Sequence, residues 1–314
     1  MTSTAISPTE KTLSPTRRKK LGLKARDTII GYLFITPQMF GFFAFVLGPM
    51  IAVFVYSLED RNLLKNTVNF IGLQNYQTIL THDPLFIKAL LNSLVFTVGI
   101  VTINVSLAMA LALLLYRSIK GMTFFRTLFF SPVVTSMVAW VLVWSFMMQP
   151  ESGTINQFLS FLGVQGPNWL HQPAWAMFSV IVVRVIKNVG LNMVILMAAV
   201  KDLPQEYMEA AQVDGANGWQ VFRNITVPLL APALILVTLL TMVGSLSVFD
   251  SILVMTNGGP NHATTVLAYY VYFEAFQVHQ VGYASALAVI LFLLILGVTV
   301  LQWSMRKRLD YHEQ

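Results

Sequence analysis

The sequence predicts an all-α, polytopic membrane protein with six transmembrane helices. Of its 314 residues, 56% are hydrophobic and only 11% are charged, whereas about 25% of the residues in a soluble domain are charged. Several apolar runs are longer than the ~20 residues that a helix needs to cross a ~30 Å hydrocarbon layer. Lys and Arg residues gather before the first run, after the last run and in alternate loops, as is typical of chains that cross a membrane repeatedly.

The positions of the basic residues predict which side each loop faces. The loops at residues 149–173 and 257–281 contain no Lys or Arg, whereas basic residues lie between the second and third runs, between the fourth and fifth, and on both flanks of the array. Because positive charge marks the cytoplasmic side, both termini and the loop between the fourth and fifth runs are expected to be cytoplasmic. The net charge of +6 follows from this asymmetry, and no nucleic-acid partner is expected.

The N-terminal part of the chain divides into a tail and a first span. Residues 1–27 are rich in Ser, Thr and Pro and then basic, which predicts a disordered cytoplasmic tail. The next apolar run is too long for the apolar region of a signal peptide and predicts an uncleaved span at residues 28–57, bent or bounded by Pro37 and Pro49. A polar external segment follows, so that residues 28–86 form one predicted region.

Residues 87–305 are predicted to hold the other five spans. These are expected at residues 87–116, 128–148, 175–200, 229–255 and 282–305. The external loop at residues 149–173 is rich in Gly, Pro, Gln and Asn and predicts a binding or packing loop. Tyrosines at residues 264–276 favour a helix at the membrane interface, and residues 306–314 are expected to form a short cytoplasmic tail.

A polar segment between the fourth and fifth runs predicts a short helix. Asp202 and Pro204 mark its start, because Pro is tolerated in a first turn and a carboxylate there favours the helix dipole. One side of the helix is small and apolar, with Tyr207 as its single aromatic residue. Gly215 can end the helix, because glycine adopts the left-handed conformation without a Cβ penalty.

The motif in this segment reads Glu209-Ala210-Ala211, then Gly215, then Ile225-Thr226-Val227-Pro228. It resembles the EAA loop of the membrane-spanning subunits of ABC importers, with Val227 where that family has Leu. In the family, this loop is a cytoplasmic coupling helix that sits in a groove of the ATPase subunit; an ordinary amphipathic loop helix is the alternative. The residues that the resemblance implies for ATPase coupling are Glu206, Tyr207, Glu209, Ala210, Ala211, Asp214 and Gly215.

Further motifs are similar to the carbohydrate-type subfamily of these permeases. They are Asp250, residues 256–260, Thr264-Thr265, and residues 269–276 and 282–286, together with the first span at residues 32–57. The resemblance implies a permease subunit for a sugar or sugar-like solute, such as an oligosaccharide, polyol or glycerol phosphate. It also implies a prokaryotic plasma membrane, a second and different permease subunit, two ATP-binding subunits and an extracytoplasmic solute-binding protein.

Several kinds of chemistry have no residues to support them in this sequence. No Gly is followed by Lys, so a phosphate-binding loop is absent, and ATP and Mg²⁺ are expected in a partner subunit. There is no cysteine, and the five histidines lack metal-ligand spacing, so no bound cofactor or metal is expected on this chain. The alternatives to a permease are an integral-membrane enzyme that acts on lipid-linked sugars and an ATP-independent carrier.

A polar stripe on the fourth span is the candidate for a translocation pathway. Arg184, Asn188 and Asn192 follow at i, i+4 and i+8, with Lys187 beside them, and therefore share a helix face. A charge near the membrane midplane costs at least ~2.5–3.5 kcal/mol, so Arg184 is expected to face the bundle interior or a wet cavity, with Asp250 as its partner. We expect the asparagines to bind solute hydroxyls and the cations to favour anionic or strongly polar solutes; a purely structural charge pair, or an arginine that snorkels to the external surface, is the alternative.

Overall fold

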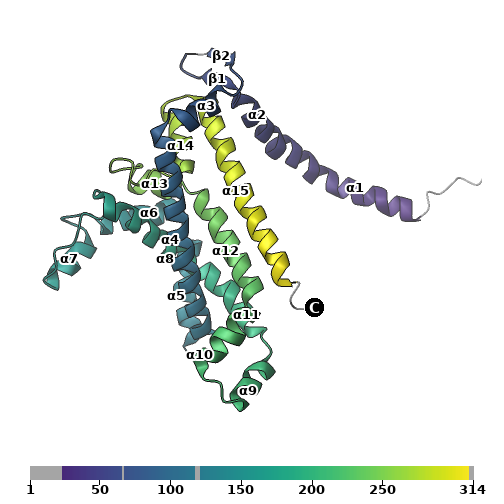
Figure 1. Ribbon diagram of the computed structural model, residues 1–314, viewed down its shortest axis with the longest axis vertical. Coiled ribbons are helices and arrows are strands. Elements are labelled where there is room, and N and C mark those ends of the chain that lie inside the picture. The colour runs from purple at the N-terminus through teal and green to yellow at the C-terminus, as the bar shows by residue number, and fades with distance from the viewer. Residues whose placement is uncertain (1–22, 66, 117–120, 311–314) are drawn as a thin grey trace, which may run out of the picture. The chain divides into compact units, whose positions relative to one another are not determined.

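A computed structural model of the chain describes residues 23–65, 67–116 and 121–310 (Figure 1). Residues 1–22 of the predicted disordered tail lie outside the described residues, and so do residues 311–314 of the predicted C-terminal tail. The chain divides into two compact units, Met1–Ala52 and Val53–Gln314. Almost all regular structure in the described part is helical, in agreement with the predicted fold class.

The predicted first span is confirmed as one long, modified helix. It comprises α1 (Leu23–Phe42), a π-helical turn (Phe43–Leu47) and α2 (Gly48–Tyr56), and it therefore begins at Leu23, inside the predicted tail. Pro49 has no N–H to donate to the carbonyl four residues before it. The Gly48 N–H instead bonds to the Phe43 carbonyl, five residues back, so this proline is accommodated by a wider turn.

The external segment contains regular structure that the sequence analysis did not predict. Strands β1 (Glu59–Asn62) and β2 (Thr67–Phe70) form an antiparallel hairpin in which Glu59 pairs with Phe70. Helix α3 (Gln74–Thr81) follows. Both strands are only four residues long, and β1 contains no apolar residue. Strand β2 alternates polar and apolar residues through only two apolar positions, Val68 and Phe70, which is too short a run to identify a strand.

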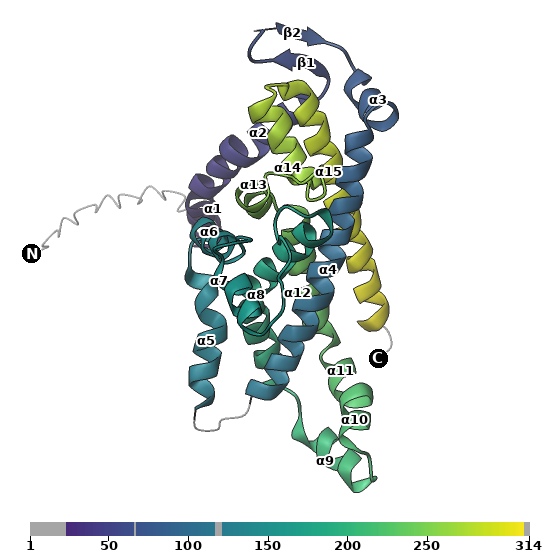
Figure 2. The same ribbon diagram turned by 90° about the vertical axis from the view of Figure 1, so that its left-hand side faces the viewer.

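Two long helices, α4 (Pro84–Leu115) and α8 (Pro173–Lys201), confirm the predicted second and fourth spans and lie side by side (Figure 2). A short helix, α7 (Thr154–Phe161), lies in the loop before α8. Helix α5 (Met122–Val134) packs against α8 at Gly190, where an added Cβ would overlap the Phe129 backbone.

The predicted third span is not one straight helix. Helix α5 ends at Val134, and α6 (Met137–Met147) leaves it at an angle of 103°. Pro132 lies inside the last turn of α5 and cannot donate a backbone hydrogen bond there. The apolar composition predicted a membrane helix correctly but did not predict this break.

The fifth span is also broken, which corrects the continuous helix expected at residues 229–255. After α9 (Gln205–Val213), the chain forms α10 (Gly218–Val221), a π-helical turn (Phe222–Thr226), α11 (Val227–Leu229) and α12 (Ala231–Leu246). The segment that ends at Leu229 and α12 meet at 68°. Pro232 lies in the first turn of α12, where its missing N–H is tolerated, so a new helix begins after the bend. Asp250 lies in a separate short helix, α13 (Asp250–Met255).

The C-terminal part has helices where an interfacial helix and a last span were predicted. Helix α14 (Leu267–Tyr272) runs into a π-helical turn (Phe273–Gln277), and α15 (Val281–Asp310) completes the bundle. Helix α15 extends beyond the expected end of the span, so residues 306–310 are helical. Within the described residues, four helices are long and apolar enough to cross a membrane, or up to six if each bent pair is one span.

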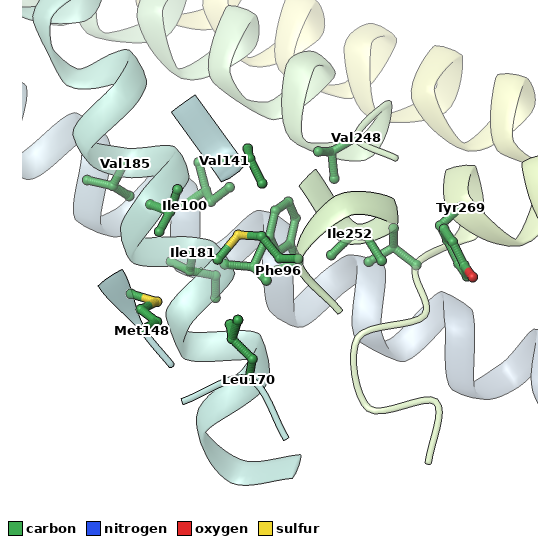
Figure 3. Close-up of a cluster of buried hydrophobic side chains, with 14 residues drawn as sticks. Phe96, Ile100, Val141, Met148, Leu170, Ile181, Val185, Val248, Ile252 and Tyr269 are labelled. Atoms are coloured by element: carbon green, nitrogen blue, oxygen red, sulfur yellow. The ribbon is translucent and has the colours of Figure 1, made fainter. Parts of the chain in front are cut away.

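The bundle core joins α4, α6, α8 and α13. Figure 3 shows one cluster of its buried side chains, in which Phe96 and Ile100 of α4 lie close to Ile181 of α8 and Ile252 of α13. Helix α9 and the β1–β2 hairpin lie at opposite ends of the second unit (Figure 2).

Candidate translocation pathway and coupling helix

A cavity of about 260 Å³ lies between α4, α8 and α12. It is lined by Ile100, Arg184, Asn188, Leu191, Asn192, Leu240, Thr241, Gly244 and Ser245. The polar members come from facing positions on α8 and α12, so the i, i+4, i+8 stripe predicted from the sequence does converge on one cavity. Lys187 is not among the lining residues.

Arg184 forms the predicted ion pair with Asp250. Its Nη1 lies 3.1 Å from Asp250 Oδ1 and 3.2 Å from Ser251 Oγ. Asp250 Oδ1 also accepts hydrogen bonds from the Ser251 backbone N–H and hydroxyl. The Arg184 side chain is 14% exposed and that of Asp250 is 35% exposed. The break between α12 and α13 thus places a carboxylate beside the charge that α8 carries into the bundle.

One atom of Arg184 has no partner in the described structure. Its Nε is buried and has no hydrogen-bond acceptor among the described residues. A buried donor without an acceptor is unfavourable by roughly 1–3 kcal/mol. The guanidinium is therefore one acceptor short at this position.

Asn192 belongs to a buried network that joins three helices. Its Nδ2 donates to Asn104 Oδ1 on α4 and to Thr241 Oγ1 on α12, at 2.5 and 2.9 Å. Asn104 Nδ2 donates in turn to the Val185 carbonyl of α8. Asn188, by contrast, lines the cavity without a side-chain hydrogen bond to any described residue. Asn192 is held by the fold, while the amide of Asn188 is free to bind a solute.

Lys187 caps the broken third span. Its Nζ donates to the carbonyls of Pro132, Val133 and Thr135 and to Thr135 Oγ1. The last carbonyls of a helix have no partner within it, and a cation near them is favourable. Lys187 is only 4% exposed, so its charge is used at the end of α5 and does not face the cavity.

Helix α9 ends at the residue that its sequence predicts, but it begins later than expected. Asp202 is the C-terminal cap of α8, and Pro204 immediately precedes α9 rather than lying in its first turn. Gly215 has a φ of +80°, its N–H bonds to the Gln212 carbonyl, and the Ala216 N–H bonds to the Ala211 carbonyl. These two bonds form a Schellman motif, which requires a left-handed residue at the glycine position. The sequence indicated the correct residue for the end of this helix.

A surface groove of about 370 Å³ runs beside α9. It is lined by Tyr207, Ala210, Ala211, Asp214, Asn224, Ile225, Pro228 and Leu229. The motif residues on either side of Gly215 therefore form one surface, although they are separate in the sequence. Glu206 and Glu209 are exposed on the same helix. Tyr207 is 56% exposed and Val213 is 89% exposed.

Asp83 is a site residue that the sequence analysis missed. Its Oδ1 accepts from the N–H groups of Leu85 and Phe86 at the start of α4, and its Oδ2 accepts from the Tyr270 and Tyr283 hydroxyls at 2.9 and 2.6 Å. One carboxylate thus joins α4, α14 and α15. The Asp-Pro pair at residues 83–84 is an N-cap signal that could have identified it.

The Asp83 cluster borders a cavity of about 550 Å³ that is also lined by Glu274. Burial, and then the nearby Asp83 carboxylate, raise the pKa of Glu274. Burial and the hydrogen bond to Asp83 likewise raise the pKa of Tyr270. Across the described ranges, no group of three or more His, Cys, Asp or Glu residues could hold a metal ion.

Comparison with known proteins identifies the family. Residues 104–311 match the family described as the binding-protein-dependent transport system inner membrane component. The chain belongs to this family. The permease is therefore a multi-pass inner-membrane subunit of an ABC transporter, and it is a transport subunit rather than an enzyme.

Two relatives illustrate the similarity. The permease is 34% identical over 281 residues to the probable ABC transporter permease protein YurN of Bacillus subtilis (strain 168), an alignment that covers 88% of this chain and 96% of YurN. It is 31% identical over 278 residues to the trehalose/maltose transport system permease protein MalF of Thermococcus litoralis, covering 88% and 94% of the two chains.

A solved structure has the same fold. It is a bacterial alginate ABC transporter in complex with an alginate pentasaccharide-bound periplasmic protein, with a TM-score of 0.79 and 22% identity. The match covers 91% of the permease and 96% of that chain. The similarity thus extends well beyond the family region, to almost the whole chain.

Proposed function

We propose that the permease forms, together with a second and different permease subunit, the translocation pathway of an ATP-driven importer for a sugar or sugar-like solute. The observation that carries this proposal is the exposed helix α9 with its groove. A short helix that ends in a Schellman motif and exposes Tyr207 and Val213 has the features of a surface built for another protein. Its sequence is the EAA motif.

The partner at α9 is an ATP-binding subunit. The groove combines apolar atoms of Ala210, Ala211 and Ile225 with the carboxylate of Asp214, which suits a protein surface better than a small polar molecule. Two such subunits bind ATP and Mg²⁺, and their closure pushes on α9. This chain binds no cofactor.

The pathway itself passes through the polar cavity. Arg184, Asn188, Asn192 and Asp250 contribute to it from this chain, and Lys187 supports it from outside by holding the end of α5. Helix α8 transmits the movement of α9 to the cavity. It carries Arg184, Asn188 and Asn192 and ends at Lys201, four residues before α9 begins. In alternating access, this connection turns the cavity from one side of the membrane to the other.

The solute class follows from the relatives. Those with 31% identity include the trehalose/maltose permease of Thermococcus litoralis and an arabinooligosaccharide permease of Halalkalibacterium halodurans. Amide and hydroxyl groups in the cavity suit hydroxylated solutes. An extracytoplasmic solute-binding protein delivers the solute on the side opposite α9, and both termini are cytoplasmic, as the Lys and Arg distribution favours.

Co-purification tests this proposal against the two other functions. Tagged permease extracted in mild detergent from its native membrane is expected to bring with it a second permease and an ATP-hydrolysing subunit. Purification of the chain without any ATPase would favour a carrier. Conversion of lipid-linked sugars by the isolated chain would favour an enzyme.

A further inference from the structure

The charge on the lining of the polar cavity is paired. Arg184 is the one charged residue among those that line it, and its guanidinium is paired with Asp250 at 3.1 Å. Lys187 is not among the lining residues, and its ammonium group donates to backbone carbonyls at the end of α5. The remaining polar lining consists of amides and hydroxyls: Asn188, Asn192, Thr241 and Ser245. The lining of the cavity therefore presents an ion pair and no unpaired charge.

The ion pair still has hydrogen-bonding capacity on both partners. Arg184 uses Nη1 for its bonds to Asp250 and Ser251, and its Nη2 donates to no described residue. Asp250 uses Oδ1 for all its hydrogen bonds to described residues, which leaves Oδ2 as an acceptor on a partly exposed side chain. The pair thus keeps donors on Nη2 and an acceptor on Oδ2.

This combination matches a hydroxyl group and does not match an anion. A hydroxyl both donates and accepts, whereas an ionised carboxylate can only accept, as can a fully ionised phosphate. An anion that approached Arg184 would also meet the Asp250 carboxylate, and like charges in a poorly solvated site repel strongly. The ion pair therefore favours uncharged hydroxylated solutes.

From this arrangement we propose that Asp250 is a specificity-determining residue that makes this side of the pathway select uncharged polyhydroxylated solutes and exclude anionic ones. The inference rests on the proposed function and narrows its solute class, since it excludes phosphate esters and uronates. It narrows the sequence-based expectation that the cations of α8 favour anionic or strongly polar solutes to the uncharged ones. The relatives leave this point open, because MalF of Thermococcus litoralis is a trehalose/maltose permease and the alginate importer takes an acidic polysaccharide.

The test uses three sugars that differ in charge at one substituent: glucose, glucuronate and glucosamine. Their binding to the complete transporter complex in lipid nanodiscs is measured by saturation-transfer NMR titration. The parental complex is expected to prefer glucose to glucuronate by about tenfold or more, the scale of an unpaired-charge penalty. Asp250→Asn leaves Arg184 unneutralised and is expected to shift this preference toward glucuronate by a similar factor.

A variant of Arg184 and a double variant keep the test decisive if Asp250→Asn does not assemble. Arg184→Gln leaves the carboxylate unneutralised and is expected to shift preference toward glucosamine. Arg184→Gln/Asp250→Asn removes both charges and is expected to keep the preference for glucose. A parental preference for glucuronate, no binding of glucose to the parental complex, or unchanged preferences in both single variants would overturn the proposal. ATP hydrolysis by the same samples reports separately on the proposed importer function.

Discussion

Two basic side chains of α8, three residues apart, have different surroundings. Arg184 borders the cavity and pairs with Asp250, whereas Lys187 points to the end of α5 and is bound by its carbonyls. The Arg184 side chain is 14% exposed and Lys187 is 4% exposed, so the loss of a partner is costly at both positions. Each side chain is therefore expected to be critical, Arg184 for the solute and Lys187 for the fold.

Replacing Lys187 tests this division at the level of a single residue. Lys187→Met keeps the length of the side chain but leaves the carbonyls at the end of α5 without a donor. Each buried carbonyl that loses its donor destabilises the folded state by roughly 1–3 kcal/mol. We expect a clear fall in the thermal denaturation midpoint of the assembled complex. Lys88→Met is the matched control, because Lys88 also donates to a backbone carbonyl, that of Asn261, but in an exposed hydrogen bond. Equal midpoints for the two variants would contradict the capping role.

At this scale, helical spacing predicted part of the site. The i, i+4, i+8 pattern brought Arg184, Asn188 and Asn192 to one cavity and indicated Asp250 as the partner of Arg184. The role of Lys187 could not be predicted in the same way. It depends on free carbonyls at a break in another helix, and side-chain periodicity contains no information about backbone groups 52 residues away.

We propose α9 as the element that connects the permease to its partner, and the end of this helix depends on one backbone conformation. Gly215 adopts a φ of +80° with no side chain near its Cα, so the obstacle to substitution is conformational rather than steric crowding. A β-branched residue is strongly disfavoured in this region. The orientation of α9 relative to residues 224–229 therefore depends on glycine at this position.

We expect Gly215→Val to lose most solute uptake while the subunit remains in the membrane. The altered helix end should weaken or misalign docking of the ATP-binding subunit, measured as the amount of that subunit retained on tagged permease. Gly218→Ala is the control, because Gly218 also has open space around it but no positive φ. Uptake and retention at the parental level in Gly215→Val would count heavily against a coupling role.

Glu274, which lines the cavity beside Asp83, is expected to make the stability of the permease depend on pH. Because the pKa of Glu274 is raised in the folded protein, the folded state binds more protons than the unfolded state at this group. Its contribution to stability is fully present below the ordinary glutamate pKa of about 4.3 and is lost as the pH rises through the raised value.

Glu274→Gln, which mimics the neutral carboxyl, is expected to raise the thermal midpoint at about pH 8 more than at about pH 5. The exposed Glu151 provides a matched Glu→Gln control. If the Glu274 variant changed the midpoint equally at both pH values, the raised pKa would not contribute to stability.

For whole elements, composition predicted where helices occur but not where they break. The third and fifth spans were expected to be continuous because their runs are mainly apolar. Their bends of 103° and 68° lie close to Pro132 and Pro232, and Lys187 binds the free carbonyls at the end of α5. The β1–β2 hairpin and α3 were missed because short, polar elements carry little periodicity.

At the scale of the whole molecule, the placement of α9 and the hairpin at opposite ends of the second unit agrees with a chain that faces two compartments (Figure 2). Reporter fusions at Gly166 and Gly215 test the sidedness. Gly166 lies in the loop without basic residues and Gly215 in the loop with them, so the fusions are expected to report opposite sides. The same side for both would overturn the proposed topology.

The central claim is that ATP hydrolysis in a partner drives solute through this permease. Its most direct test is uptake of radiolabelled solute into proteoliposomes that contain the complete complex, with ATP enclosed and the solute-binding protein added outside. We expect uptake only when ATP and binding protein are both present, with loss of most uptake in Gly215→Val. Uptake at the full rate without ATP would contradict the claim.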